Sequence, residues 1–388
     1  MNRPSLTCVQ ASRGLAALSV AAYHLAIIAG PQGSPLFDGW FSFGRLGVDF
    51  FFVLSGFIIL HAHAEDIGHP SRLSRYATKR FTRIYPIYWA ILVVAIVAHR
   101  LFHLGRWNWL TSFTLLHFTD YGTPLVPAWT LFHEVLFYAV FGVLIASRKW
   151  GFALLAAWGV AIVARHHYPR WQEFSASDTV LALYNLDFFL GMGVYMFHRY
   201  VRQPAAVLAA SLLGVAALSV YEHAAAVEIY PLRLAYGALF AGTLAALVQL
   251  EQTRALAASA LLVLLGDASY ALYLVHDDAA KAMVHRLGIA HPVALFPVML
   301  AAICAAAILV HLWVERPLLR TLRGGRFTAR QPLDRPRAAR RRRRPAHHSR
   351  RHFASWSADE LTRSGCQRRH PTTRERPAVP REPEAACV

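Results

Sequence analysis

Ten apolar segments of about twenty residues recur along this chain, and they constrain its fold more than any other feature. They lie near residues 11–30, 44–63, 84–102, 128–147, 151–168, 180–198, 205–222, 230–250, 258–280 and 293–315. A helix needs about 20 mostly apolar residues to cross the hydrocarbon core of a bilayer. Only 16 % of the 388 residues are Asp, Glu, Lys or Arg, against about 25 % in a typical soluble domain. The sequence therefore argues against a soluble protein and predicts an all-α, polytopic membrane protein with about ten transmembrane helices.

The formal charge of +18 is concentrated near the C-terminus. Residues 319–388 hold 19 Arg and 6 acidic residues, which leaves only +5 on residues 1–318. A segment with so much charge and so few large apolar side chains cannot offset the entropy lost on ordering. We therefore predict a transmembrane domain over residues 1–318 and a basic, disordered tail over residues 319–388. Attraction to anionic lipid is the expected role of this charge, and no nucleic-acid partner is expected.

The loop between the second and third apolar segments sets the expected orientation. It contains a cluster of basic residues: Arg72, Arg75, Lys79, Arg80 and Arg83. Basic loops face the cytoplasm, so an even number of spans places both termini there. The segment 107–118 is too short to span, and its tryptophans favour an interfacial helix.

Ionisable residues inside apolar segments are functional candidates, because an unpaired charge in the bilayer is costly. Arg13 and His24 stand 11 residues apart, which is about 1100° of helical rotation and places them on one face. His24, Asp49 and Glu134 are expected at similar depth. A histidine beside a carboxylate is a plausible general base, oriented by either Asp49 or Glu134. The alternative is a structural polar cluster between helices.

Arg80 and Arg83 share one helix face, and with Lys79 and Arg13 they are expected to form a cationic rim at the cytoplasmic side. Such a rim suits phosphate groups, which Arg binds in a bidentate manner, and coenzyme A thioesters carry several of them. The alternative is an ordinary cluster of cytoplasmic positive charge.

Four aromatic or imidazole side chains complete the predicted substrate contacts: Tyr85, Trp129, Tyr273 and His276. An interfacial anchor is the alternative role for Trp129. No metal-binding spacing occurs, so no metal is expected.

The order of these motifs resembles the integral-membrane acyltransferases of acyltransferase family 3. The matching features are Arg13-x10-His24, Gly47-Val-Asp49 through Ser55-Gly-Phe57, Arg80-Phe-Thr-Arg83-Ile-Tyr-Pro86, Pro127-Ala-Trp-Thr-Leu-Phe-His-Glu134, Gly266-Asp267 through His276, and Val314-Glu-Arg-Pro317. Together they span residues 8–320. Two departures are His133 beside the matched glutamate, and Asp277 with Asp278 where an aromatic residue is frequent.

The resemblance implies an O-acyltransferase of the bacterial inner membrane that takes an acyl group, usually acetyl, from cytoplasmic acyl-CoA. Acetyl-CoA would be a co-substrate, with no bound cofactor. The implied acceptor is a hydroxyl of an extracytoplasmic glycan or a lipid-linked sugar, and the Pro127–Glu134 element is most similar to members linked to exopolysaccharide production. Glycan-synthesis or export machinery is the implied protein partner.

Several alternatives remain open at this point. The acceptor could instead be a small molecule such as a macrolide, or lipopolysaccharide O-antigen. Transfer could be direct or could pass through an acyl-histidine intermediate. Outside this enzyme class, the same intramembrane charges would serve a proton relay in a polytopic transporter, or the chain would be a structural scaffold of a glycan-export complex.

Overall fold

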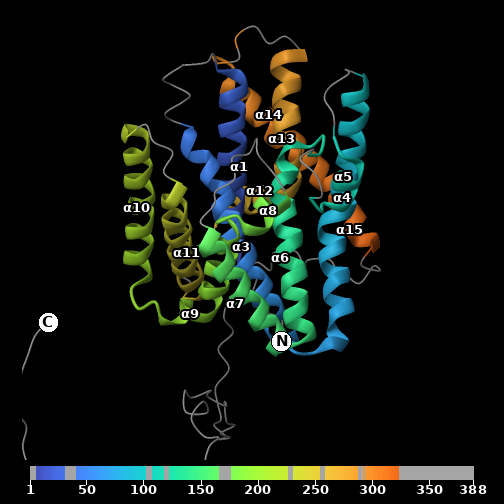
Figure 1. Ribbon diagram of the computed structural model, residues 1–388. Helices are drawn as coiled ribbons and strands as arrows, with labels where there is room; N and C mark the ends of the chain where they lie inside the picture. The colour runs from blue at the N-terminus through green and yellow to red at the C-terminus, as the bar shows by residue number, and fades with distance from the viewer. Residues whose placement is uncertain are drawn as a thin grey trace, which may run out of the picture. The chain divides into compact units, whose positions relative to one another are not determined.

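The computed structural model describes residues 6–30, 41–101, 107–117, 122–165, 176–225, 230–253, 258–286, 291 and 293–322. These residues belong to one unit, residues 1–328. A second unit, residues 329–388, lies outside the described residues, and so does most of the predicted basic tail. Across the described ranges the regular elements are helical and no β-strand occurs (Figure 1).

The α-helices are, in chain order, α1 (Thr7–Ala29), α3 (Gly47–His63), α4 (Leu73–Leu101), α5 (Trp109–Thr114), α6 (Trp129–Ala146), α7 (Arg148–Arg165), α8 (Ala176–Leu181), α9 (Asn185–Phe197), α10 (Pro204–Ala225), α11 (Tyr230–Gln252), α12 (Ala260–Asp267), α13 (Ser269–Lys281), α14 (Phe296–Val310) and α15 (Arg316–Leu322). Short helical turns join them: η1 (Ser42–Leu46), η2 (Ala64–Asp66), η3 (Pro70–Arg72), η4 (Val126–Ala128), η5 (His198–Tyr200), η6 (Ala282–Arg286) and η7 (His311–Glu315). The last two, η6 and η7, are π-helical.

Each of the ten predicted segments is mainly helical where the structure describes it, which confirms the all-α prediction. Within the described ranges, seven helices are long and apolar enough to cross a membrane, or eight if a bent pair forms one span. The two remaining segments, 151–168 and 180–198, contain α7 and the 13-residue α9, which do not meet that test. The count of ten and the cytoplasmic termini remain predictions.

The segment 258–280, predicted as one straight span, is broken at Ala268. α12 and α13 meet there at 72°. Just before the break, α12 lies very close to α1, because a Cβ added to Gly266 would lie 1.8 Å from the carbonyl oxygen of Gln10. The bend redirects α13, the helix that carries Tyr273 and His276, while α13 keeps its packing against α1, α4 and α14.

Many large apolar side chains are exposed on the outer helices, as expected of helices that face lipid. α10 packs mainly against α11 (Figure 1), and Ser211 is its one buried residue among those described. Leu213 in α10 and Val160 in α7 are each 70 % exposed. Exposure of so many large apolar side chains is unusual for a soluble monomer, and this supports the membrane prediction.

Glycine permits a very close helix crossing between α3 and α9. A Cβ on Gly56 would lie 2.0 Å from the carbonyl oxygen of Phe188, and a Cβ on Gly191 would lie 1.8 Å from that of Val53. Small residues let helices approach closely in membranes.

We expect Gly191→Ala to lower the free energy of unfolding by about 1–3 kcal/mol, because the added methyl group forces the two backbones apart. Gly193→Ala is the matched control, since nothing lies within 4 Å of a Cβ at that position on the same helix. Thermal unfolding in detergent should show a lower midpoint for the first variant only. Equal midpoints would contradict the close crossing.

Candidate active site

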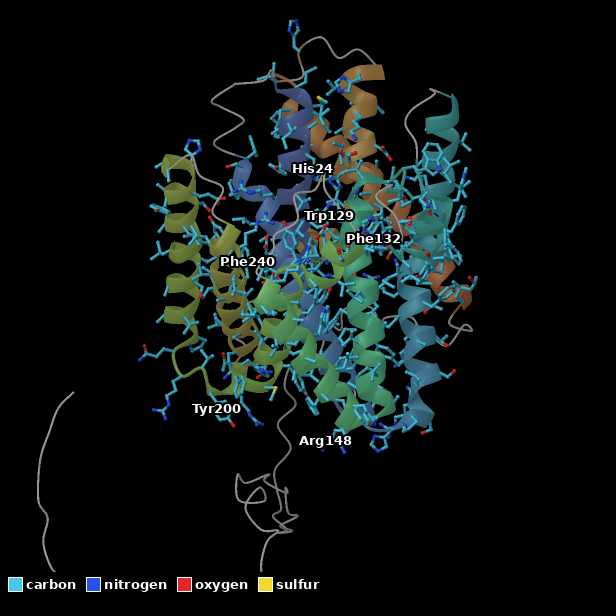
Figure 2. All side chains as sticks on the ribbon, viewed as in Figure 1. His24, Trp129, Phe132, Arg148, Tyr200 and Phe240 are labelled. Atoms are coloured by element: carbon cyan, nitrogen blue, oxygen red, sulfur yellow. The ribbon has the colours of Figure 1, made fainter. Side chains whose placement is uncertain are left out.

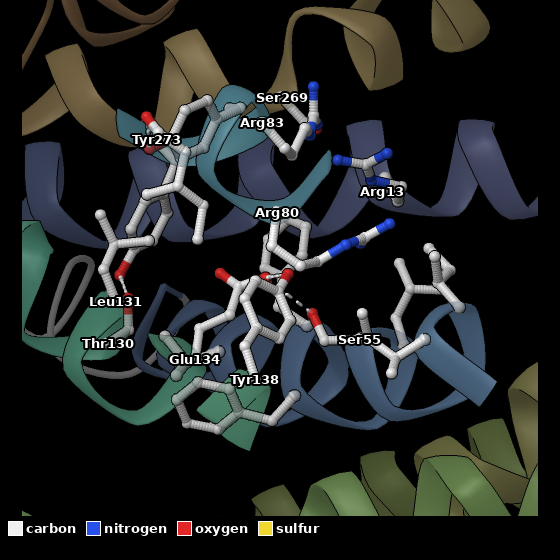
Figure 3. A pocket seen from close by; sticks show the side chains of 18 residues that line it. Arg13, Ser55, Arg80, Arg83, Thr130, Leu131, Glu134, Tyr138, Ser269 and Tyr273 are labelled. Atoms are coloured by element: carbon white, nitrogen blue, oxygen red, sulfur yellow. Dashed lines mark hydrogen bonds between the residues drawn. The ribbon is translucent and has the colours of Figure 1, made fainter. Parts of the chain in front are cut away.

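A cavity of about 140 Å³ lies among α1, α3, α4, α6 and α13. Its polar lining combines three arginines with one carboxylate and several hydroxyls: Arg13, Ser55, Arg80, Arg83, Thr130, Glu134, Tyr138, Ser269, Tyr270 and Tyr273. Apolar side chains of α3 close the remainder, among them Phe51, Phe52 and Ile59. Figure 3 shows the side chains of Arg13, Arg80 and Arg83 around one space, with Glu134 beside it. The cavity can therefore accept an anionic group next to an apolar chain.

Arg80 is held between two tyrosine rings. Its guanidinium carbon lies 5.9 Å from the ring centre of Tyr76 and 5.6 Å from that of Tyr138. Cation–π contacts of this length are attractive, and they fix the plane of the guanidinium. A third contact comes from His63 at the end of α3, whose Nε2 lies 3.2 Å from Arg80 Nη2.

Arg83 is anchored by a buried glutamate from the C-terminal end of the bundle. Arg83 Nη1 donates to Glu315 Oε1 over 3.1 Å, and His311 Nδ1 lies 2.8 Å from Glu315 Oε2. Glu315 is fully buried and ends the π-helical turn η7, a kind of irregularity that is frequent at functional sites. Arg83 also packs on the Tyr270 ring at 5.5 Å. The Glu315 carboxylate and the Tyr270 ring thus hold the Arg83 guanidinium at the cavity.

Arg13 is the third cationic group, and it comes from α1. Its Nη1 donates to Gln10 Oε1 over 3.3 Å, and Gln10 Nε2 donates to Asp267 Oδ1 over 2.8 Å. Arg13, Arg80 and Arg83 thus converge on one space, as the sequence predicts. Lys79, the fourth residue of the predicted rim, is exposed and does not line the cavity.

Glu134 supplies the carboxylate of this cavity. Its Oε1 accepts a hydrogen bond from Tyr138 one turn later in α6, and Ser55 Oγ lies 3.4 Å away (Figure 3). Glu134 therefore joins α6 to α3 and brings negative charge to a cationic space.

His24 is bonded to a second histidine. His24 Nδ1 lies 2.6 Å from His276 Nε2, although the two residues are 252 positions apart in the chain. The rings are nearly parallel, with an interplanar angle of 9° and centroids 4.8 Å apart. His24 itself is labelled on α1 in Figure 2. The packing of α13 on α1 therefore creates a histidine pair that neither helix contains alone.

The hydrogen-bond network assigns the tautomers of this pair. His276 Nδ1 lies 3.1 Å from the carbonyl oxygen of Leu272, so it must carry the proton. In neutral His276 the Nε2 atom is then the acceptor, which places the proton of His24 on Nδ1. The remaining nitrogen, His24 Nε2, carries a lone pair. His24 therefore has the tautomer that a general base acting through Nε2 requires.

Tyr273 connects the histidine pair to the cavity. Its ring centre lies 5.8 Å from that of His276, and its side chain lines the cavity. The Tyr273 hydroxyl is 2.6 Å from Thr130 Oγ1 and donates to the Pro127 carbonyl oxygen over 3.0 Å. The histidines thus adjoin the arginine-lined space with one aromatic ring between them.

The expected contact of His24 with Asp49 or Glu134 does not occur. Asp49 is fully buried, and neither of its carboxylate oxygens has a hydrogen-bond partner among the described residues. Its electrostatic neighbours are Asp187 of α9 and the arginines Arg233 and Arg45. These electrostatic neighbours of Asp49 come from α9, α11 and η1, and not from the two histidines. Helical depth, which the sequence indicates, does not determine these neighbours.

Two other predicted contacts lie outside the cavity lining. Tyr85 donates to the Thr114 carbonyl oxygen over 2.6 Å and stacks with Phe81. Trp129 packs edge-on against His133, with ring centres 5.8 Å apart. His133 is fully buried, and its Nδ1 lies 3.0 Å from Asn185 Oδ1. These contacts join α4 to α5 and α6 to α9.

Among the described residues, no group of three His, Cys, Asp or Glu side chains could hold a metal ion.

The sequence over residues 7–314, which contains this site, matches the acyltransferase domain family. The chain belongs to acyltransferase family 3. The match covers every helix that contributes to the cavity and both histidines. The predicted family membership is therefore confirmed, and the protein is an O-acyltransferase with membrane helices.

Three relatives illustrate the range of the family. The chain is 32 % identical over 318 residues to the exopolysaccharide production protein ExoZ of Rhizobium meliloti. That alignment covers 74 % of this chain and 94 % of the relative. It is 28 % identical to acyltransferase MdmB of Streptomyces mycarofaciens, over 85 % of this chain and 95 % of that one. It is 26 % identical to the peptidoglycan O-acetyltransferase OatA of Listeria monocytogenes, over 38 % of this chain and 26 % of the relative. No solved structure matches the chain with significance.

Several residues of this site were not predicted from the sequence, among them Glu315, Tyr138 and His63. Glu315 belongs to the Val314–Pro317 motif, but its contact with Arg83 spans 232 residues, so no local pattern assigns it a role. Tyr138 lies one turn after Glu134, and helical spacing could have found it. His63 ends a helix beside a cluster of loop charges and carries no signal of its own.

Proposed function

We propose that this protein transfers an acetyl group from cytoplasmic acetyl-CoA to a hydroxyl of an extracytoplasmic or lipid-linked polysaccharide, in the bacterial inner membrane. The observation that carries the donor assignment is the cavity in which Arg13, Arg80 and Arg83 converge beside apolar side chains of α3. Phosphates and a pantetheine chain require that combination of charge and apolar surface. The acceptor assignment rests on the similarity to ExoZ over 94 % of that relative.

In the proposed reaction the phosphates of acyl-CoA bind the arginines, and the thioester extends toward His24. His24 Nε2 takes the proton of the acceptor hydroxyl, whose oxygen attacks the thioester carbonyl carbon. The tetrahedral intermediate breaks its C–S bond, and the departing CoA thiolate takes the proton back from His24. His276 holds His24 in the required tautomer, as the hydrogen bond between the two rings supports. Tyr273 lies between the two parts and is proposed to contact the substrate.

The proposal gives supporting roles to the four other predicted residues, which are Glu134, Asp49, Tyr85 and Trp129. Glu134 faces the donor cavity and is proposed to order the bound substrate together with Tyr138. Asp49 is proposed to act through the α3–α9 packing that surrounds it. Tyr85 and Trp129 are proposed to support the walls of the site through α5 and α9.

The acceptor assignment predicts a change in the surface glycan of the source cell. Deleting the gene should remove O-acetyl signals from the proton NMR spectrum of purified polysaccharide, and the wild-type gene should restore them. Complementation with a His24→Ala variant at equal protein level is the control and should not restore them. Unchanged O-acetylation after deletion would point to a small-molecule or O-antigen acceptor instead.

A further inference from the structure

The donor-site residue Arg80 contacts His63 at the edge of the cavity. Arg80 Nη2 lies 3.2 Å from His63 Nε2, and His63 is only 1 % exposed. A guanidinium offers donors and no acceptor. The contact therefore requires a lone pair on His63 Nε2, which only the neutral imidazole can offer there.

The other ring nitrogen fixes the same tautomer. His63 Nδ1 lies 2.7 Å from Asp66 Oδ2, so Nδ1 carries the proton and donates it to the carboxylate. Asp66 is held in turn, because Arg72 Nη1 donates to Asp66 Oδ1 over 2.8 Å. A continuous chain of hydrogen bonds thus runs from the η2–η3 loop through His63 to Arg80 in the cavity wall.

We propose that His63 is a positioning residue for the donor site, which holds Arg80 in place while neutral and releases it when protonated. The inference rests on the proposed function, because it requires Arg80 to contact the phosphates of acyl-CoA. It adds a dependence on the pH of the donor side of the membrane to that function.

The surroundings of His63 make the protonated state unfavourable for this contact. The charged and titratable groups that face it, or that hold its partner, are Asp66, Arg72, Tyr76, Lys79 and Arg80. Tyr76 packs edge-on against the His63 ring at 4.9 Å and 88°. A proton on Nε2 would set an imidazolium N–H against the Arg80 guanidinium and remove its acceptor. Arg80 must then turn away from His63 and from the plane that the two tyrosines define.

A purely structural role for His63 makes a different prediction. A residue that only closes the end of α3 would change the stability of the protein when replaced. It would not change the affinity for acyl-CoA in a manner that follows pH. Donor affinity as a function of pH therefore separates the two roles.

The experiment measures the dissociation constant of acetyl-CoA for the full-length protein in detergent at pH 8 and pH 6. His63→Gln offers an amide oxygen near the Nε2 position and cannot take up a proton, whereas His63→Ala removes the contact. The matched control is His69→Gln, because His69 is exposed in the loop that follows α3 and its Nδ1 contacts the nearby Ile67 carbonyl oxygen. Acetyl-pantetheine, which lacks the nucleotide phosphates, serves as the control ligand.

We expect His63→Ala to raise the dissociation constant of acetyl-CoA about tenfold at pH 8. This is the change expected when Arg80 loses about one charge-assisted hydrogen bond to a phosphate. His63→Gln should bind like the wild type at pH 8 and lose less affinity than the wild type at pH 6. The part of the pH dependence that remains in His63→Gln belongs to the phosphates of the ligand, which also titrate near pH 6. Acetyl-pantetheine binding should be the same in all variants.

Arg80→Ala separates failure of this inference from failure of the proposed function. If Arg80→Ala weakens acetyl-CoA binding while His63→Ala binds like the wild type, the positioning role is wrong and the donor site stands. If neither variant changes the affinity, both are wrong. If His63→Ala weakens binding but Arg80→Ala does not, His63 does not act through Arg80, and the inference is again overturned.

Discussion

Replacing His24 with alanine is expected to lower the turnover of acyl transfer by about 10²- to 10⁴-fold, the usual contribution of a general base. The affinity for acyl-CoA should change little, because His24 does not line the arginine cavity. His276→Ala should cost less, about 10- to 100-fold, since it removes the acceptor that fixes the His24 tautomer and leaves His24 Nε2 in place. Initial rates with saturating donor, measured at equal protein in membranes, test both values.

The control for this pair is His223→Ala, because His223 is an exposed histidine in the last turn of α10, a helix that packs mainly on α11. It should retain wild-type turnover. A His24→Ala enzyme with wild-type turnover would exclude His24 as the base. A large loss for His24→Ala together with an unchanged rate for His276→Ala would keep the base but contradict the role of the histidine pair.

The second large effect is expected at the donor cavity. Arg83→Ala should raise the KM for acyl-CoA about 10- to 100-fold with a smaller change in kcat, because a charge-assisted hydrogen bond to phosphate is lost. The double variant Arg80→Ala/Arg83→Ala should raise it further. Arg83→Lys keeps a charge near Glu315 but lacks the planar fork of arginine, so an intermediate KM is expected.

Arg83→Ala leaves the buried Glu315 carboxylate with one fewer partner, so this variant could be less stable. Arg83→Lys keeps a positive charge there and separates a loss of donor binding from a loss of folding. Arg75→Ala is the matched control, because Arg75 is an exposed residue of the same helix. It should show the wild-type KM. A set of arginine variants in which kcat falls and KM stays constant would argue against donor binding in this cavity.

The sequence predicted the parts of this site that depend on position along a single helix. The spacing of Arg13 and His24, and of Arg80 and Arg83, placed each pair on one face, and the cavity indeed receives Arg13, Arg80 and Arg83. The helical segments themselves follow from apolar length, which hydropathy reports directly. These features need no knowledge of which helices are neighbours.

What the sequence could not predict depends on which helices meet. The bond of His24 with His276 joins α1 to α13, the helix that begins after the bend at Ala268. The neighbours of Asp49 could not be predicted for the same reason. The sequence placed Asp49 at the depth of His24, but in the structure its neighbour is Asp187 on α9. Helical periodicity gives a residue's depth and phase on its own helix, whereas the neighbour it meets is set by packing between helices.

The most direct test of the proposed reaction follows the acyl group itself. Inside-out membrane vesicles containing the protein are supplied with acetyl-CoA labelled in the acetyl group, and label is measured in the polysaccharide or lipid-linked sugar fraction. The proposed reaction predicts labelled acceptor with the wild-type protein, and almost none with His24→Ala or with Arg80→Ala/Arg83→Ala at subsaturating donor. Equal labelling by all three proteins, or release of free acetate with no labelled acceptor, would contradict it.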